Sequence, residues 1–262
     1  GCAVGDFNDD GFPDIYVTAY GRSSLWRNNG DGSFSEIGES AKAVVDAWSS
    51  SVAFADFNGD GLLDLYVVTY IKADDDPPRI CPHPQSPTGT TQCSPTLFQA
   101  FDDVLLLNNG DGQFVDLTRE SGINGRDGKG LGIVACDFDD DGQLEVFVAN
   151  DGTPCFFYDA IENVRDQTAG GIQFSKYSES GAETGVALNG SGRPTAAMGV
   201  AHGDYDRDGW IDLFITNFYL EPNTLFRNLA GRGFIDASAS SRLGPPSRMK
   251  LVFGTDFFDV DH

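Results

Sequence analysis

Short apolar segments alternate along the chain with turns rich in Asp, Asn and Gly. One set contains mostly small residues and comes just before a polar nine-residue stretch, at residues 51–55, 132–136, 198–202 and 250–254. A second set is rich in β-branched and aromatic residues and comes just after that stretch, at residues 14–18, 64–68, 145–149 and 212–216. Such side chains favour strands. The pattern therefore predicts pairs of strands, each joined by a polar turn.

A third strand and a tight hairpin follow in most of these units. The run Asn-Asn-Gly-Asp-Gly precedes Phe34 and again Phe114, and a degenerate form precedes Phe234. Asn-Gly and Asp-Gly supply the positive φ that tight hairpins need, so each Phe is expected to open a fourth strand. Self-similarity on this scale indicates a repeat architecture, and small side chains suit a crowded inner strand. The predicted fold is all-β, a β-propeller of four-stranded blades.

The predicted units differ in length because two of them carry insertions. Their boundaries are placed near residues 1–47, 48–122, 123–190 and 191–245, with a partial unit at 246–262, all within one domain. The second unit carries an insertion at residues 71–101. The third carries one at 156–193, where Gly170-Gly171 is expected to replace the missing hairpin signal and a short helix is expected at 159–165. Loops on a rigid scaffold are common binding sites.

Composition narrows the class of partner. Forty acidic against seventeen basic residues give a net charge of -23, which argues against nucleic acid and anionic membrane surfaces, since both attract a basic face. No apolar run is long enough to span a membrane, so no membrane insertion is expected. Among five cysteines, Cys81 and Cys93 lie in a Pro- and Thr-rich stretch where a disulfide would hold a loop without a core. That pairing predicts an oxidising compartment, so the protein is expected to be extracellular, at the cell surface or periplasmic.

The nine-residue stretch, here called the acidic phrase, carries the chemistry. It begins at residues 6, 56, 137 and 204, with Gly at its sixth position, and a fifth copy begins at 259 and is cut off. Oxygen-bearing side chains at alternate positions of a tight turn are ligands that calcium accepts, and Gly permits the turn. The predicted side-chain ligands are Asp6, Asn8, Asp10 and Asp14; Asp56, Asn58, Asp60 and Asp64; Asp137, Asp139, Asp141 and Glu145; Asp204, Asp206, Asp208 and Asp212; and Asp259 and Asp261 in the partial copy.

The seventh position of each acidic phrase is expected to contribute a backbone carbonyl, from Phe12, Leu62, Gln143 and Trp210. An EF-hand is excluded because its twelfth-position Glu is replaced by Val17, Val67, Val148 and Ile215 and its following helix by strand-forming residues. Magnesium is the weaker choice because it prefers octahedral sites with retained waters. Polar turns without an ion remain the alternative, but several like charges in one turn repel. About four structural Ca²⁺ sites, one per blade, are predicted.

These residues carry a family likeness. The phrase Asp-x-Asn/Asp-x-Asp-Gly-x-x-Asp, followed by a strand and the Asn-Asn-Gly-Asp-Gly hairpin, resembles the FG-GAP/VCBS repeats of integrin-α-type β-propellers. Residues 148–154, 197–200, 216–225 and 253–258 are similar to bacterial ASPIC/UnbV proteins related to cartilage acidic protein. The resemblance implies a propeller with calcium in the blade hairpins and an exported protein, and it implies no defined reaction. With about four units and a truncated copy, the chain is expected either to be a segment of a larger propeller or to form an open arc with exposed edge strands.

Three functions are open at this point. The leading one is a module that binds protein or carbohydrate through its blade loops; the others are a propeller-based polysaccharide-active enzyme and a structural spacer. The three histidines His83, His202 and His262 are scattered, so no catalytic residue is assigned and no enzyme is expected. His202 is expected to be a packed core or channel residue. Asp102 and Asp103, and the run at 74–76, are expected to be solvated loop acids, and Cys136 a small buried residue.

Overall fold

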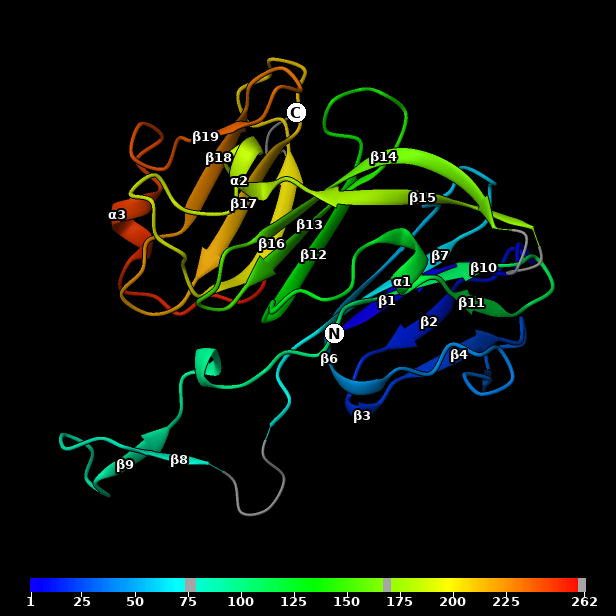
Figure 1. The fold of residues 1–262 in the computed structure, drawn as a ribbon, viewed down its shortest axis with the longest axis horizontal. Coiled ribbons are helices and arrows are strands. Elements are labelled where there is room, and N and C mark those ends of the chain that lie inside the picture. The colour runs from blue at the N-terminus through cyan, green and yellow to red at the C-terminus, as the bar shows by residue number, and fades with distance from the viewer. Residues whose placement is uncertain (74–78, 167–170, 259–262) are drawn as a thin grey trace.

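The computed structural model describes residues 1–73, 79–166 and 171–258. Four antiparallel sheets follow one another along the chain (Figure 1). The first sheet contains β1 (Cys2–Gly5), β2 (Asp14–Val17), β4 (Ser24–Asn28) and β5 (Phe34–Glu36). The second contains β6 (Asp46–Ala55), β7 (Asp64–Thr69), β10 (Val104–Asn108) and β11 (Phe114–Asp116), with β3 (Tyr20–Arg22) added at the β6 edge. The expected all-β class is confirmed.

The third and fourth sheets have the same strand order. The third contains β12 (Gly130–Cys136), β13 (Glu145–Asn150), β14 (Phe156–Asp166) and β15 (Ile172–Glu179). The fourth contains β16 (Ala197–Gly203), β17 (Asp212–Asn217), β18 (Thr224–Asn228) and β19 (Phe234–Asp236). The described α-helices are single turns, α1 (Thr118–Ser121), α2 (Gly181–Thr184) and α3 (Gly244–Ser247). In the described part of the chain, no helix has the length and apolar character needed to cross a membrane.

The first strands of neighbouring sheets contact one another, β1 with β6, β6 with β12 and β12 with β16. Small residues make this approach possible. A Cβ added to Gly132 of β12 would lie 2.8 Å from the carbonyl oxygen of Met198 on β16. Apolar clusters fill the spaces between the sheets: Leu25 and Leu65 belong to one, Tyr66 and Val146 to the next, and Phe147 and Leu213 to the third. The expected strands rich in small residues are therefore present at 51–55, 132–136 and 198–202, as parts of β6, β12 and β16.

The insertion of the second sheet forms a separate projection (Figure 1). It contains β8 (Ile80–Pro82), β9 (Thr90–Gln92) and a 3-10 helix (Pro95–Leu97). The predicted disulfide between Cys81 and Cys93 is present. At the base of the insertion, Ile71 pairs with Ala100 and the Lys72 N–H donates to the Gln99 carbonyl at 2.7 Å.

Several expectations are wrong. Residues 159–165 form strand rather than helix, because β14 pairs with β15 from Tyr158↔Glu179 to Asp166↔Ile172. Gly170 of the expected Gly170-Gly171 signal lies outside the described residues. Residues 250–254 form no strand; they pack beside β16 and β17, where the Phe253 carbonyl accepts from the Thr216 hydroxyl at 3.2 Å.

Three side-chain expectations are corrected in whole or in part. Asp103 is buried rather than solvated, because it accepts hydrogen bonds from Thr69 and Tyr66 inside the second sheet. His202 is exposed on β16, so it is not a packed core residue, and its alternative place in a channel stays a prediction. Cys136 is half-buried rather than buried. The acidic run at 74–76 and His262 lie outside the described residues.

Candidate metal centre

Each acidic phrase is the loop between the first and second strands of its sheet. The residue before the phrase pairs with its ninth residue, as Gly5↔Asp14, Ala55↔Asp64, Cys136↔Glu145 and Gly203↔Asp212. The sixth-position glycines all have positive φ, from 84° to 91°. The fourth positions are also left-handed, with φ of 55° at Asp9, 63° at Asp140 and 61° at Arg207, a conformation that Asp tolerates better than most residues. The four loops therefore share one backbone course.

The first-position carboxylate closes each loop. In the first copy, Asp6 accepts from the Asp10 N–H at 3.1 Å and from the Gly11 N–H at 2.8 Å. Asp56, Asp137 and Asp204 accept from the equivalent N–H groups of their own loops. These bonds satisfy the backbone donors of the turn and fix the carboxylate at its mouth.

The ninth-position carboxylate is the buried anchor of each site. Asp14, Asp64 and Asp212 are fully buried and Glu145 nearly so. Asp64 accepts from the Phe57 N–H at 2.9 Å and from the Asn108 N–H at 2.8 Å. Burial raises the pKa of Asp64 to about 8, and nearby carboxylates add to this against the two N–H bonds. Burial, with the Asp139 and Asp137 charges, raises the pKa of Glu145 to about 8.

The third and the fourth acidic phrases each bring three carboxylates close together. Oxygens of Asp137, Asp139 and Glu145 lie within 4.8 Å of one another, and so do those of Asp204, Asp206 and Asp212. Calcium binds carboxylate oxygens at about 2.3–2.6 Å, so oxygens spaced this closely can share one ion. Burial raises the pKa of Asp139, and the charges of Asp141 and Asp137 raise it further. A cation would offset that repulsion between the carboxylates. Both groups could hold a metal ion. In the fourth acidic phrase, a guanidinium nitrogen of Arg227 lies 3.8 Å from a carboxylate oxygen of Asp206.

The fifth-position carboxylates lie outside these two groups. Asp141 instead accepts from the Gln143 N–H at 2.8 Å, and Asp208 from the Trp210 N–H at 3.0 Å. Asp10 and Asp60 accept likewise from the Phe12 and Leu62 N–H groups. The seventh-position residues are thus seen as N–H donors, and their carbonyl role stays a prediction.

The first and second phrases are built around Asn. Asn8 donates through Nδ2 to Asp10 at 2.9 Å, and Asn58 to Asp60 at 3.0 Å. Their Oδ1 atoms each accept from the N–H of the same aspartate. Among the described residues, these two phrases place no three carboxylates as close together as the later two do. Asp259 and Asp261 of the partial copy lie outside the described residues.

Each of the first three phrases is tied to the following sheet through its second-position carbonyl. Asn108 Nδ2 donates to the Phe7 carbonyl at 2.7 Å, Ser175 Oγ to that of Phe57 at 3.0 Å, and Asn228 Nδ2 to that of Phe138 at 2.8 Å. Sequence reasoning missed these residues. The shared Asn at the end of β10 and β18, in the run before the hairpin glycine, was the available signal for two of them.

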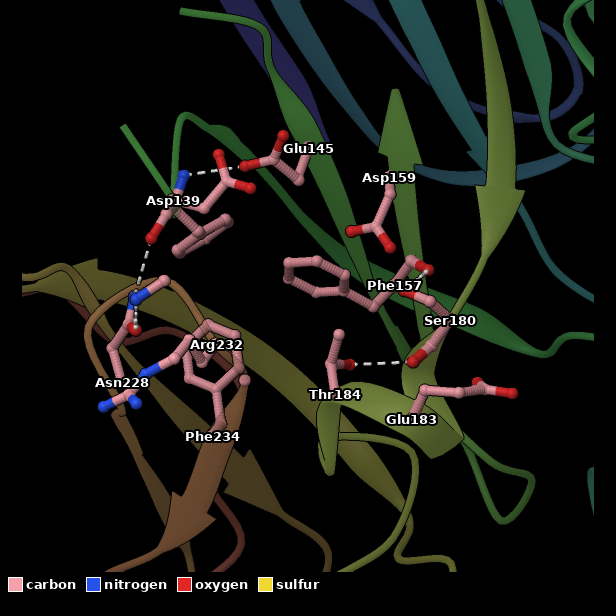
Figure 2. Close-up of a pocket in the computed structure, with 13 residues that line it drawn as sticks. Asp139, Glu145, Phe157, Asp159, Ser180, Glu183, Thr184, Asn228, Arg232 and Phe234 are labelled. Atoms are coloured by element: carbon pink, nitrogen blue, oxygen red, sulfur yellow. Dashed lines mark hydrogen bonds between the residues drawn. The ribbon is translucent and has the colours of Figure 1, made fainter. Parts of the chain in front are cut away.

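The third phrase also opens on a cavity of about 280 Å³ between the third and fourth sheets (Figure 2). Its acidic side contains Asp139 and Glu145 together with Asp159 of β14 and Glu183 of α2, both missed by sequence reasoning. Figure 2 shows Asp159 pointing into the cavity. Burial and nearby carboxylates raise the pKa of Asp159. The rings of Phe138, Phe157 and Phe234 pack against one another at 5.6 to 5.7 Å between centroids.

Comparisons with solved structures give distant similarities. An Agrocybe aegerita lectin, described as recognising non-reducing terminal N-acetylglucosamine, is 17% identical over 88% of this chain and 49% of its own, with a TM-score of 0.42. The V. cholerae biofilm matrix protein Bap1 is 17% identical over 89% and 38%, with a TM-score of 0.35. The Photorhabdus luminescens Tc holotoxin pore is 15% identical over 90% and 12%, with a TM-score of 0.25. The chain spans about half the length of the first and less of the others.

No curated protein matches the chain significantly in sequence. A family model, described as an FG-GAP-like repeat, matches residues 6–67 of the chain. The matched region, residues 6–67, contains the first and second acidic phrases and the strands that follow them. By this match, residues 6–67 carry an FG-GAP-like repeat, the repeat family that the sequence resembles.

Proposed function

We propose that the chain is a calcium-stabilised extracellular binding module whose four sheets act as blades of a β-propeller. The observation that carries this is the acidic phrase at one register in all four sheets, with a buried ninth-position carboxylate each time. The contacts between the first strands of neighbouring sheets support the blade arrangement. We also propose that the protein is related to the ASPIC/UnbV proteins that its sequence resembles.

The oxygen-rich donor set of each phrase suits calcium, and about four sites are proposed, one per blade. Asp137, Asp139 and Glu145 would hold one ion, and Asp204, Asp206 and Asp212 another. In the first two phrases the Asn Oδ1 atoms would take the place of one carboxylate. Calcium would supply positive charge where buried carboxylates repel, so its role is structural.

Binding rather than catalysis is proposed for the module, with protein or carbohydrate as the ligand. The two insertions present long loops on a rigid scaffold, which is where binding sites commonly form. The Cys81–Cys93 disulfide fits an oxidising compartment and hence a secreted, cell-surface or periplasmic location.

A paired screen tests this function. The protein is applied to glycan and protein arrays in millimolar calcium and again in chelator, and calcium binding is measured by calorimetry. We expect saturable calcium binding and at least one array ligand that is retained only with calcium. Calcium binding without any array ligand would favour a spacer, and release of products from polysaccharides would favour an enzyme. Failure to bind calcium would refute the proposal.

A further inference from the structure

A second cleft, of about 510 Å³, lies away from the acidic phrases. It is bounded by Trp48 of β6 and by Tyr70, which follows β7, and on the other side by the disulfide-bonded insertion. Polar side chains of β9 line it together with Arg79 and Phe98. No residue of the four acidic phrases is among the described residues that line this cleft.

Aromatic rings form one side of the cleft. The Tyr20 and Trp48 ring centroids lie 5.2 Å apart at 81°, and those of Trp48 and Tyr70 lie 5.1 Å apart at 75°. Edge-to-face contacts of this kind hold rings in fixed orientations. The Tyr70 hydroxyl donates to Asp151 at 2.6 Å, which fixes the end of the row. Trp48 and Tyr70 line the cleft and are both half-buried, whereas Tyr20 packs against Trp48 outside the lining.

The opposite side is a preformed wall. The disulfide joins β8 to the residue after β9, and the Ile71–Ala100 bridge closes the base of the insertion. Arg79 donates to the Leu97 carbonyl at 2.9 Å and lies over the Phe98 ring at 5.1 Å. This cross-linking reduces the entropy lost when a ligand binds. Thr90, Thr91 and Gln92 of β9, which carry hydroxyl and amide groups, line the cleft on this side.

We propose that this cleft binds one or two residues of a neutral oligosaccharide, an assignment that rests on the proposed binding function. A pyranose ring has an apolar face of C–H groups and a rim of hydroxyls. The aromatic row matches the first, and the hydroxyl and amide groups of β9 match the second. The volume is that of a small-molecule pocket, whereas a protein partner needs about 800 Å² of surface on each side. The net charge of -23 disfavours acidic glycans.

Calorimetric titration of the intact protein with cello-, chito-, manno- and xylo-tetraose tests the assignment. We expect saturable binding of at least one of them, weakened tenfold or more by Trp48→Ala. The matched control is Trp26→Ala, since Trp26 is a partly exposed Trp on β4 outside the cleft; its affinity should equal that of wild type. Gln92→Ala, at an exposed position of β9, should weaken binding at least threefold without a risk to folding.

Calcium titration of the same preparations separates the two proposals. If calcium binds normally but none of the four saccharides does, the cleft assignment is overturned and the module itself stands. Equal saccharide affinity in Trp48→Ala, Gln92→Ala and wild type would place the sugar elsewhere and also overturn the assignment. Loss of calcium binding in wild type would instead refute the proposed function.

Discussion

At the scale of single residues, Asp103 is a buried acid that the acidic phrases do not explain. Burial raises its pKa to about 7, above the ~3.9 of an unfolded chain. Between these pH values the folded protein holds a proton that the unfolded chain has released. The free energy of unfolding therefore falls as pH rises through this window.

Replacing Asp103 by Asn should remove that pH dependence. The amide can still accept from the Thr69 N–H, and its NH₂ can face the Tyr66 oxygen. Urea unfolding should show Asp103→Asn gaining stability relative to wild type as the pH rises from about 4 to about 7. Asp102→Asn, at the exposed neighbouring carboxylate, is the control and should show no such gain. If the difference in the free energy of unfolding between Asp103→Asn and wild type did not change with pH, Asp103 would not have a raised pKa in the folded protein.

Asp103 also shows where sequence reasoning stops. Two adjacent aspartates before β10 carry no sign of which is buried, because that depends on Thr69 and Tyr66 from β7. The acidic phrase was predictable because its spacing alone fixes the turn and its donors. Asp159 was not, because it reaches the third phrase only through the packing of β14.

The Asn in the first acidic phrase offers a second test. In Asn8→Asp, the donated bond from Nδ2 to Asp10 is lost and another carboxylate faces Asp6 and Asp14. Additional negative charge should tighten calcium binding several-fold and destabilise the calcium-free protein. Calorimetry and unfolding in chelator measure the two effects. Asn29→Asp, in the neighbouring exposed hairpin, should change neither, and an unchanged affinity in Asn8→Asp would argue against Asn8 as a ligand.

At the scale of elements, the β14–β15 hairpin ties the third sheet to the second acidic phrase. Ser175 is buried and donates to the Phe57 carbonyl, and Asn58 Nδ2 donates to the Gln173 carbonyl at 2.9 Å. A short helix was expected within this insertion, at residues 159–165. Strand pairing with residues 172–179 overrides that local preference.

Removing the Ser175 hydroxyl should therefore weaken the contact between these sheets. Ser175→Ala leaves the Phe57 carbonyl without its side-chain donor, at a cost of about 1–3 kcal/mol in the free energy of unfolding. Ser178→Ala, an exposed position on the same strand, should stay within about 0.5 kcal/mol of wild type. Denaturant unfolding compares them, and equal stability of the two variants would show that the contact contributes nothing.

At the scale of the whole molecule, the acidic phrases and the contacts between sheets are expected to stabilise the four sheets together. The four sheets share three apolar clusters, and each of the first three phrases is bonded to the next sheet. An ion held by one phrase would thus stabilise the neighbouring sheet as well. Because the sheets share their apolar clusters, we expect them to unfold in a single transition. Forty acidic residues against seventeen basic ones repel one another in the compact state, so this transition is expected to depend on calcium.

Thermal unfolding in calcium and in chelator tests this coupling. At millimolar calcium and a site dissociation constant near ~10⁻⁴ M, each ion adds roughly 1.4 kcal/mol. Two occupied sites would then raise Tm by about 6–11 °C, since ~1 kcal/mol corresponds to about 2–4 °C in a domain of this size. Potassium chloride at matched ionic strength only screens exposed charges, and magnesium fits these loops less well, so both should raise Tm less. If potassium chloride matched calcium, the effect would be general screening, and the buried ninth-position carboxylates would need no ion to stabilise the fold.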